Sequence, residues 1–169
     1  MKTPEEKLEA KIDRWHKKFL AVSIGQVFNG TRRPRKNLEF GLATNYQKLV
    51  RLRAMDDNGY CQCVSCGRSY HWTAMNGGHY VGRSNYRTII DFQDMFPDRL
   101  IQQVWPQCVR CNDHFSGNHV PYREFLVAAF GTEKVEELEA AKLPENHIWD
   151  KRKLAELKVS FLEEIKELT

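Results

Sequence analysis

Cys63-Val64-Ser65-Cys66 sets the fold of this chain, together with a second Cys-x-x-Cys pair, Cys108-Val109-Arg110-Cys111. Each pair can place two thiolates on one tetrahedral ion, with a zinc about 2.3 Å from each sulfur. Four sulfur ligands close the coordination sphere, so the pattern predicts a structural zinc site rather than a catalytic one. Redox pairs and unrelated core cysteines are the alternatives. The metal would then hold together the two ends of the segment that lies between the cysteine pairs.

The segment between the cysteine pairs contains a histidine that follows two glycines, in Asn76-Gly77-Gly78-His79-Tyr80. The adjacent glycines predict a turn, because glycine permits positive φ and close approach of the backbone to a ligand. A lone histidine is more often structural than catalytic. Here, however, the second cysteine pair is followed directly by Asn112-Asp113-His114, so the metal would fix an amide and an imidazole at the start of a short helix. We therefore expect His79 to face Asn112 across a gap the size of a hydrated cation.

Composition indicates one compact globular domain with appended helices. Hydrophobic residues make up 41% of the 169 residues and charged residues 28%, which argues against disorder. We find neither an apolar run of the roughly 18 residues that a membrane span needs nor a secretory signal, and expect a cytoplasmic protein without a membrane partner. A reducing compartment argues against disulfides. The fifth cysteine, Cys61, is interpreted as a bystander in the strand before Cys63, with a competing metal ligand as the alternative.

The net charge of +4 is unevenly distributed. Residues 1–53 carry 13 Lys and Arg against 5 acidic residues, residues 54–123 are neutral, and residues 124–169 carry 7 bases against 11 acids. This asymmetry fits a nucleic-acid ligand that approaches from one side, or solvated helix faces without a partner. In Arg32-Arg33-Pro34-Arg35-Lys36, the proline interrupts any helix and leaves four cations on an extended segment. That segment suits a phosphate backbone, with an unstructured linker as the alternative.

Helical patterns flank the cysteine-bearing middle. Thr3-Pro4-Glu5-Glu6 combines an N-cap, a first-turn proline and a capping-box glutamate, and predicts a helix to about Val22, followed by a loop containing Gly25. Further helices are expected over 42–53, from Val120 to a stop at Gly131, from a Thr132 cap to about Leu143, and after an Asp150 cap. We expect an α+β fold in three parts. These are N-terminal helices with a basic linker (1–58), a zinc-braced core (59–131) and C-terminal helices (132–169).

At these residues the chain resembles the HNH, or ββα-metal, nucleases that a four-cysteine zinc braces. More narrowly, it resembles the lambda NinG (Rap) recombination endonuclease family of phages and prophages. The resemblance covers about residues 42–142. The matching elements, in order, are Cys63-Val64-Ser65-Cys66-Gly67, Gly78-His79-Tyr80, Gln107-Cys108-Val109-Arg110-Cys111-Asn112-Asp113-His114, Ser116-Gly117-Asn118 and Val120-Pro121-Tyr122-Arg123.

The resemblance implies a structure-specific DNA endonuclease that cleaves Holliday junctions and D-loops in the host cytoplasm. It makes His79 the general base, Asn112 a ligand of a catalytic Mg²⁺ or Mn²⁺, and His114 either a second ligand or a phosphate contact. Phosphodiester hydrolysis suits these residue types, because histidine can deprotonate water near neutral pH. A divalent metal stabilises the phosphorane and the departing 3′ oxygen. Branched DNA and phage recombinase proteins are the expected partners. A homodimer would suit symmetric resolution of a junction.

Two features depart from the family pattern. Gly78 stands where many HNH enzymes place an acidic or histidine metal ligand, and the spacing does not choose a substitute among Asp91, Asp94, Asp98 and Asp113. Gln103 stands where the lambda relative has an asparagine. The glycine at position 78 is consistent with a rival function, a zinc-dependent nucleic-acid-binding module without catalysis. A third possibility is an HNH nuclease without structure preference.

Cations near the proposed site are the expected DNA contacts, because arginine matches phosphate geometry. Each one separately can instead be a surface or ion-pair residue. The candidate contacts are Arg32, Arg33, Arg35, Lys36, Arg83, Arg110 and Arg123. Trp105 and Tyr122 are interpreted as core aromatics, with stacking on an unpaired base as the alternative.

Overall fold

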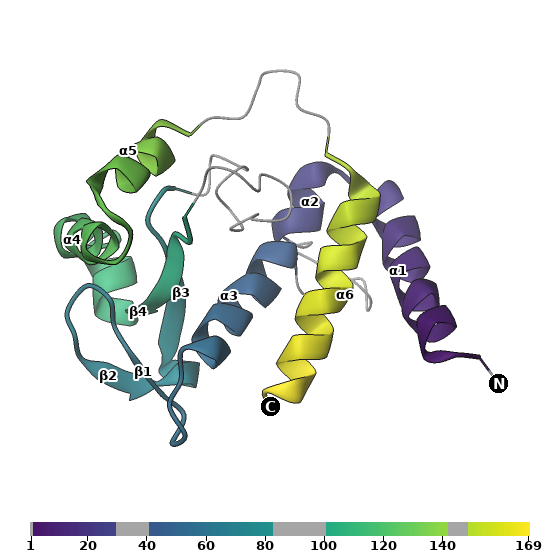
Figure 1. Ribbon diagram of the computed structural model, residues 1–169, viewed down its shortest axis with the longest axis horizontal. Coiled ribbons are helices and arrows are strands. Elements are labelled where there is room, and N and C mark those ends of the chain that lie inside the picture. The colour runs from purple at the N-terminus through teal and green to yellow at the C-terminus, as the bar shows by residue number, and fades with distance from the viewer. Residues whose placement is uncertain (1, 30–40, 83–100, 142–148) are drawn as a thin grey trace. The chain divides into compact units, whose positions relative to one another are not determined.

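The computed structural model describes residues 2–29, 41–82, 101–141 and 149–169 (Figure 1). The chain forms two compact units. The first joins Met1–Tyr46 to Asn146–Thr169, and the second is Gln47–Glu145. Helices and two small antiparallel sheets make up the described residues, so the predicted α+β class is confirmed. None of the described helices has the length and apolar character needed to cross a bilayer.

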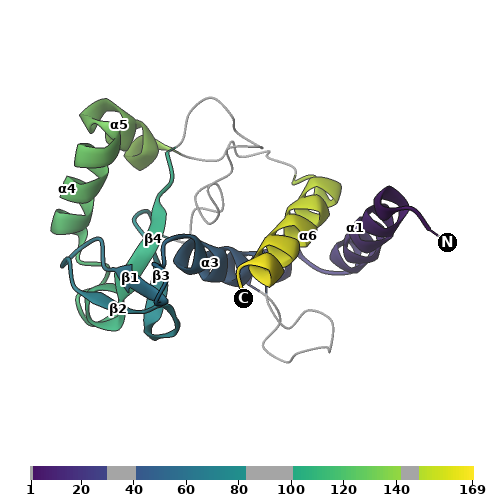
Figure 2. The same cartoon turned by 60° about the horizontal axis from the view of Figure 1, so that its bottom comes forward.

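The first unit is built on two long helices, α1 (Pro4–Leu20) and α6 (Lys151–Glu167), which pack side by side (Figures 1 and 2). The predicted capping box starts α1, since the Glu6 amide donates to Thr3 Oγ1 over 3.1 Å and the Thr3 amide donates to Glu6 Oε2 over 2.7 Å. Asp150 caps α6 as predicted. A Lys11–Glu163 ion pair of 2.7 Å links the two helices at the surface.

A short helix, α2 (Ile24–Asn29), lies where the sequence predicted a loop. Ser23 caps it, because its amide donates to Gln26 Oε1 over 3.0 Å and its hydroxyl accepts from the Gln26 amide. Val27 and Phe28 are buried, and the Phe28 ring meets the Trp149 ring edge-on at 5.0 Å. Burial of these two side chains offsets the helix cost of Gly25, which is about 1 kcal/mol relative to alanine.

A buried lysine interrupts the apolar face of α6. Lys158 is 2% exposed, its ammonium donates to Asn45 Oδ1, and it lies 4.7 Å from the centre of the Trp15 ring. The Lys18 ammonium lies 4.3 Å from the same ring. Burial, and then the charge of Lys18, lower the pKa of Lys158 from 10.5 to about 8. The sequence pattern does not reveal the burial of Lys158, because the leucines around it are helically spaced without it.

Lys158→Met is expected to stabilise the protein at pH 7. The folded-state pKa lies below the unfolded value, so the buried ammonium destabilises the fold at pH 7, and this cost is relieved as the pH rises from about 8 towards 10.5. The pKa shift corresponds to a destabilisation of about 3 kcal/mol, which Lys158→Met removes. About 1 kcal/mol of this gain is lost, because Asn45 no longer has its hydrogen-bond donor. Urea unfolding at pH 7 and pH 10 measures both effects.

The control for this prediction is Lys166→Met, at an exposed position of the same helix. The wild type and Lys166→Met should both gain stability between pH 8 and pH 10, whereas Lys158→Met should gain much less. Equal gains in all three proteins would contradict a neutralised, buried Lys158.

The second unit begins within α3 (Leu42–Arg53) and continues through the sheets. β1 (Tyr60–Gln62) pairs with β2 (Ser69–His71), and after the short helix η1 (Trp72–Ala74), β3 (Met75–His79) pairs with β4 (Val104–Cys108). Register aligns Met75 with Cys108 and His79 with Val104. Arg51 ties α3 to this hairpin, since its guanidinium donates to the Met75 carbonyl over 2.7 Å.

Three helices complete the second unit, the π-turn η3 (Arg110–His114), α4 (His119–Phe130) and α5 (Thr132–Ala140). Their core is a cluster of Tyr80, Tyr122, Leu126, Val135 and Leu138. Tyr122 is the central residue, because its hydroxyl lies 2.9 Å from the Gly78 carbonyl and 2.8 Å from that of Gln103. Tyr122 is fully buried and Trp105 packs on Phe125 and Phe130, so both predicted core aromatics are confirmed. Gly131, rather than the predicted Thr132, occupies the N-cap of α5.

The predicted turn at Gly77 and Gly78 is wrong, since both residues lie inside β3. Neither has a positive φ. Glycine is required here for space. A Cβ on Gly77 would lie 2.8 Å from the Gln47 Cα, and one on Gly78 would lie 2.2 Å from Gln107 Oε1. The paired glycines therefore let α3 approach one face of the hairpin and the buried Gln107 side chain occupy the other.

Candidate active site and metal centre

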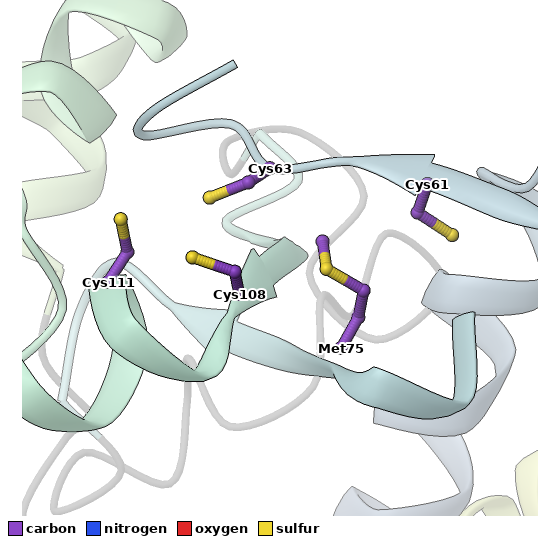
Figure 3. Packing of buried hydrophobic residues seen from close by; sticks show 5 residues of the cluster. All are labelled: Cys61, Cys63, Met75, Cys108 and Cys111. Carbon is purple, nitrogen blue, oxygen red and sulfur yellow. The ribbon is translucent and has the colours of Figure 1, made fainter. Parts of the chain in front are cut away.

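Four cysteines from two distant parts of the chain gather at one point. The sulfurs of Cys63, Cys66, Cys108 and Cys111 all lie within 4.8 Å of one another. Figure 3 shows the Cys63, Cys108 and Cys111 sulfurs pointing towards a common centre. Four thiols at this spacing could bind a metal such as zinc, so the pairing of the two motifs is as the sequence predicted.

Backbone hydrogen bonds hold the two cysteine pairs together. The Cys63 amide donates to the Arg68 carbonyl, and the Gly67 amide, at a φ of +71°, donates back to the Cys63 carbonyl over 2.8 Å. The Val64 amide donates to the Pro106 carbonyl over 3.1 Å, which fixes the first pair to β4. Cys108 ends β4 and Cys111 lies in η3. The hairpin and the π-turn therefore meet at the cysteine cluster.

The cluster holds its thiols in different protonation environments. Burial raises the pKa of Cys111 to about 12 and also raises that of Cys66. Burial acts in the same direction on Cys63, but the backbone amides of Cys108, Ser65 and Cys66 outweigh it and lower the pKa. Bound metal requires thiolates, so its binding would release protons from the thiols with raised pKa.

Cys61 stands apart from the cluster, as predicted. Its sulfur points away from the other sulfurs in Figure 3 and donates to the Arg51 carbonyl over 3.1 Å. Burial raises the pKa of this thiol. Cys61 is therefore a buried hydrophobic residue beside Met75.

Beside the cysteine cluster lies a cavity of about 480 Å³. Among the described residues, it is lined by Gln47, Asn76, Gly77, His79, Gly82, Asn112, Asp113, Ser116, Gly117 and His119. His79 and Asn112, which the sequence predicted to face each other, therefore share one cavity. His114 does not line it and is exposed at the end of η3.

The two sides of the cavity carry different chemistry. On one side, Gln47 Nε2 lies 3.5 Å from His79 Nδ1. On the other, the Asn112 amide donates to Asp113 Oδ1, and the Asn76 amide lies 3.3 Å from Asp113 Oδ2. The cavity thus sets an imidazole beside a carboxylate and two carboxamides, which are the hard oxygen donors that Mg²⁺ prefers.

A carboxylate at position 78 would not fit this structure. Gln107 is buried beside Gly78, and its Nε2 donates to Ser65 Oγ and to the Gly117 carbonyl. Within the described residues, Gln107 Oε1 has no hydrogen-bond partner. The space beside Gly78 is therefore filled by the Gln107 side chain, and among the described residues that line the cavity Asp113 is the one carboxylate. Asp91, Asp94 and Asp98 lie outside the described residues.

The candidate DNA contacts are dispersed. Arg110 is exposed, with its guanidinium 5.0 Å from the centre of the Phe115 ring. Arg123 pairs with Glu139 over 2.9 Å. The remaining candidates lie outside the described residues, namely Arg32, Arg33, Arg35, Lys36 and Arg83.

The sequence pattern did not indicate two side chains that line the cavity, Gln47 and His119. Gln47 lies far from the cysteine motifs along the chain, in a helix whose pattern signals only packing. His119 is the first residue of α4 and follows a left-handed turn, with positive φ at Ser116, Gly117 and Asn118. The Ser-Gly-Asn sequence signals a turn before this histidine, but the spacing does not tell where the turn directs the ring.

These features define a class of small α+β protein, in which a cysteine cluster that could hold a metal stands beside a polar cavity. The chain belongs to the family described as the bacteriophage lambda NinG protein, whose model matches residues 31–169. It is similar to protein ninG of Escherichia phage lambda, with 36% identity over 108 residues. Those residues are 63% of this chain and 47% of the relative.

Similarity extends to other phages. Protein ninG of Escherichia phage 933W is 36% identical and that of Salmonella phage P22 is 35% identical, each over 108 residues, with the same shares of the two chains. The chain thus spans about half the length of the curated relatives it matches. No solved structure matches it.

Proposed function

We propose that this chain is a metal-dependent endonuclease that hydrolyses phosphodiesters in branched DNA such as Holliday junctions and D-loops. The observation that carries the proposal is the shared cavity of His79 and Asn112 beside the four-cysteine cluster. Membership of the NinG family supports it. Branched DNA and a phage recombinase are the proposed partners, with a homodimer as the proposed form on a symmetric junction.

In the proposed reaction, His79 takes a proton from water as the water oxygen attacks phosphorus. Gln47 Nε2 lies 3.5 Å from His79 Nδ1 and would hold the imidazole in place at its side of the cavity.

The oxygen donors of the cavity fit a hydrated divalent cation. Asn112 and Asp113 would hold it, and Asn76 would orient the Asp113 carboxylate through its amide. When bound, Mg²⁺ or Mn²⁺ supplies positive charge to the phosphate. The four cysteines would hold a structural zinc that fixes η3, and with it Asn112, against the hairpin.

His79→Ala is expected to lower the rate of junction cleavage by about 10²- to 10⁴-fold, the usual contribution of a general base. The assay compares a labelled four-way junction with linear duplex of the same sequence, in Mg²⁺ or in EDTA. Zinc content should be unchanged. The matched control is His71→Ala. His71 is an exposed histidine on β2 that hydrogen-bonds to Thr73, so this variant should cleave like the wild type.

Other results of this cleavage assay would support a different function. Junction binding without cleavage by the wild type supports the non-catalytic binding module and overturns the proposal. Equal cleavage of junction and linear duplex supports a nuclease without structure preference. Full activity of His79→Ala removes His79 from the reaction.

A further inference from the structure

His119 is a second imidazole of the cavity that the proposed mechanism does not use. It stands among the lining residues with His79, Asn112 and Asp113. The His119 side chain is exposed and, within the described part of the chain, the ring makes no hydrogen bond. Both ring nitrogens can therefore meet a molecule that enters the cavity.

The backbone before His119 is built to bring this ring to the cavity. Ser116 and Asn118 have φ values of 49° and 44°, and Gly117 lies between them at 95°. Such residues are uncommon and cluster where a structure imposes a functional conformation. A Cβ on Gly117 would lie 3.0 Å from His119 Nε2, so glycine leaves the ring its place.

A network that runs from the buried Tyr80 to the exposed pair of Glu139 and Arg123 lies on the other side of the ring. Tyr80 meets His119 edge-on, with 5.7 Å between ring centres. The Tyr80 hydroxyl donates to Glu139 Oε1, which also accepts from Arg123 Nε over 2.9 Å. Burial, and then Glu139, raise the pKa of Tyr80 to about 12, so this donor stays protonated at neutral pH. Tyr80 is therefore a positioning residue for His119.

From this geometry we infer that His119 is the general acid of the proposed hydrolysis and donates its proton to the departing 3′ oxygen. The inference rests on the proposed function. Water oxygen forms the new bond to phosphorus and gives its proton to His79. The bond from phosphorus to O3′ breaks, and O3′ takes the proton from His119. The products are a 5′-phosphate and a 3′-hydroxyl, with no oxidant or co-substrate consumed.

A DNA junction with sulfur in place of the leaving oxygen tests whether His119 acts as the general acid. The wild-type cut site is mapped first, and a second junction is made with sulfur in place of the 3′ oxygen at that linkage. A thiol has a pKa of about 8.5, so a thiolate leaves without protonation, whereas an alkoxide does not. Both substrates are assayed in Mn²⁺, which tolerates sulfur better than Mg²⁺.

His119→Gln is expected to cleave the oxygen junction about 100-fold or more slowly than the wild type, and the sulfur junction within about threefold of it. His79→Ala should be slow on both junctions, because sulfur does not replace the base. His71→Gln is the control and should match the wild type on both. Unchanged zinc content and thermal midpoint show that His119→Gln is folded.

Three results would overturn the inference. These are an oxygen-junction rate equal to that of the wild type, an equal loss on both junctions, and recovery of the His119→Gln rate on the oxygen junction as the Mn²⁺ concentration is raised, which would indicate a metal ligand. Each leaves the proposed function standing, provided that the wild type cleaves. A wild type that cleaves neither junction overturns the proposed function and this inference with it.

Discussion

Cys108→Ser is expected to abolish stoichiometric zinc binding and to unfold the second unit. Cys108 is the last residue of β4, and its sulfur lies in one cluster with that of Cys111 in η3, so loss of the Cys108 sulfur disconnects the hairpin from η3. Zinc binding at such sites is worth about 10–16 kcal/mol, more than the roughly 5–15 kcal/mol by which a domain is stable. Zinc content by mass spectrometry and near-ultraviolet circular dichroism measure the two effects.

The matched control is Cys61→Ser, because Cys61 is a buried cysteine outside the cluster. Its thiol donates to the Arg51 carbonyl, and a serine hydroxyl can replace that donor. This variant should bind one zinc per chain and keep its fold. A folded, zinc-loaded Cys108→Ser protein would show that the cluster is not a metal site.

Gly78→Asp is expected to destabilise the second unit by about 3 kcal/mol. The new Cβ would lie 2.2 Å from Gln107 Oε1 and 2.9 Å from Gln107 Cβ. Gln107 cannot turn aside without losing its bonds to Ser65 and Gly117. Gly78→Ala should show the same loss, since the clash begins at Cβ. Urea unfolding measures both variants.

A double-mutant cycle tests the cause of this loss. If Gln107 is the obstacle, Gly78→Ala combined with Gln107→Ala should be more stable than the sum of the two single losses predicts, by about 1 kcal/mol or more. Additive losses would mean that the backbone at position 78, and not Gln107, rejects the side chain. A fully stable Gly78→Asp protein would contradict the packing of the hairpin described here.

Local chemistry explains what the sequence could predict. The capping box at Thr3, the Asp150 cap and the stop at Gly131 act within one helical turn, so their outcome does not depend on tertiary contacts. The sequence also predicted that the two cysteine pairs lie together, because four thiolates at this spacing suit one tetrahedral ion. Asn112 follows from them, since it comes directly after Cys111, whereas His79 lies at the opposite end of β3 from the Met75–Cys108 pair.

What the sequence could not show depends on distant neighbours. The glycines of β3 look like a turn until Gln47 and Gln107 are known to fill the space beside them. Lys158 looks like a surface residue until Asn45 and Trp15 close over it. The exchange of His114 for His119 as the cavity's second histidine arises from the left-handed turn at residues 116–118, whose direction no spacing rule predicts.

The discontinuous first unit constrains how the chain can fold during translation. α1 leaves the ribosome long before α6 is made, and at 5–20 residues per second the delay is on the order of ten seconds. Throughout that interval the nascent chain displays the apolar face of α1, including Ile12 and Phe19, without the helix that covers it. The cysteine-bearing unit is continuous in the chain, so it can fold on the ribosome while the first unit still lacks its last helix.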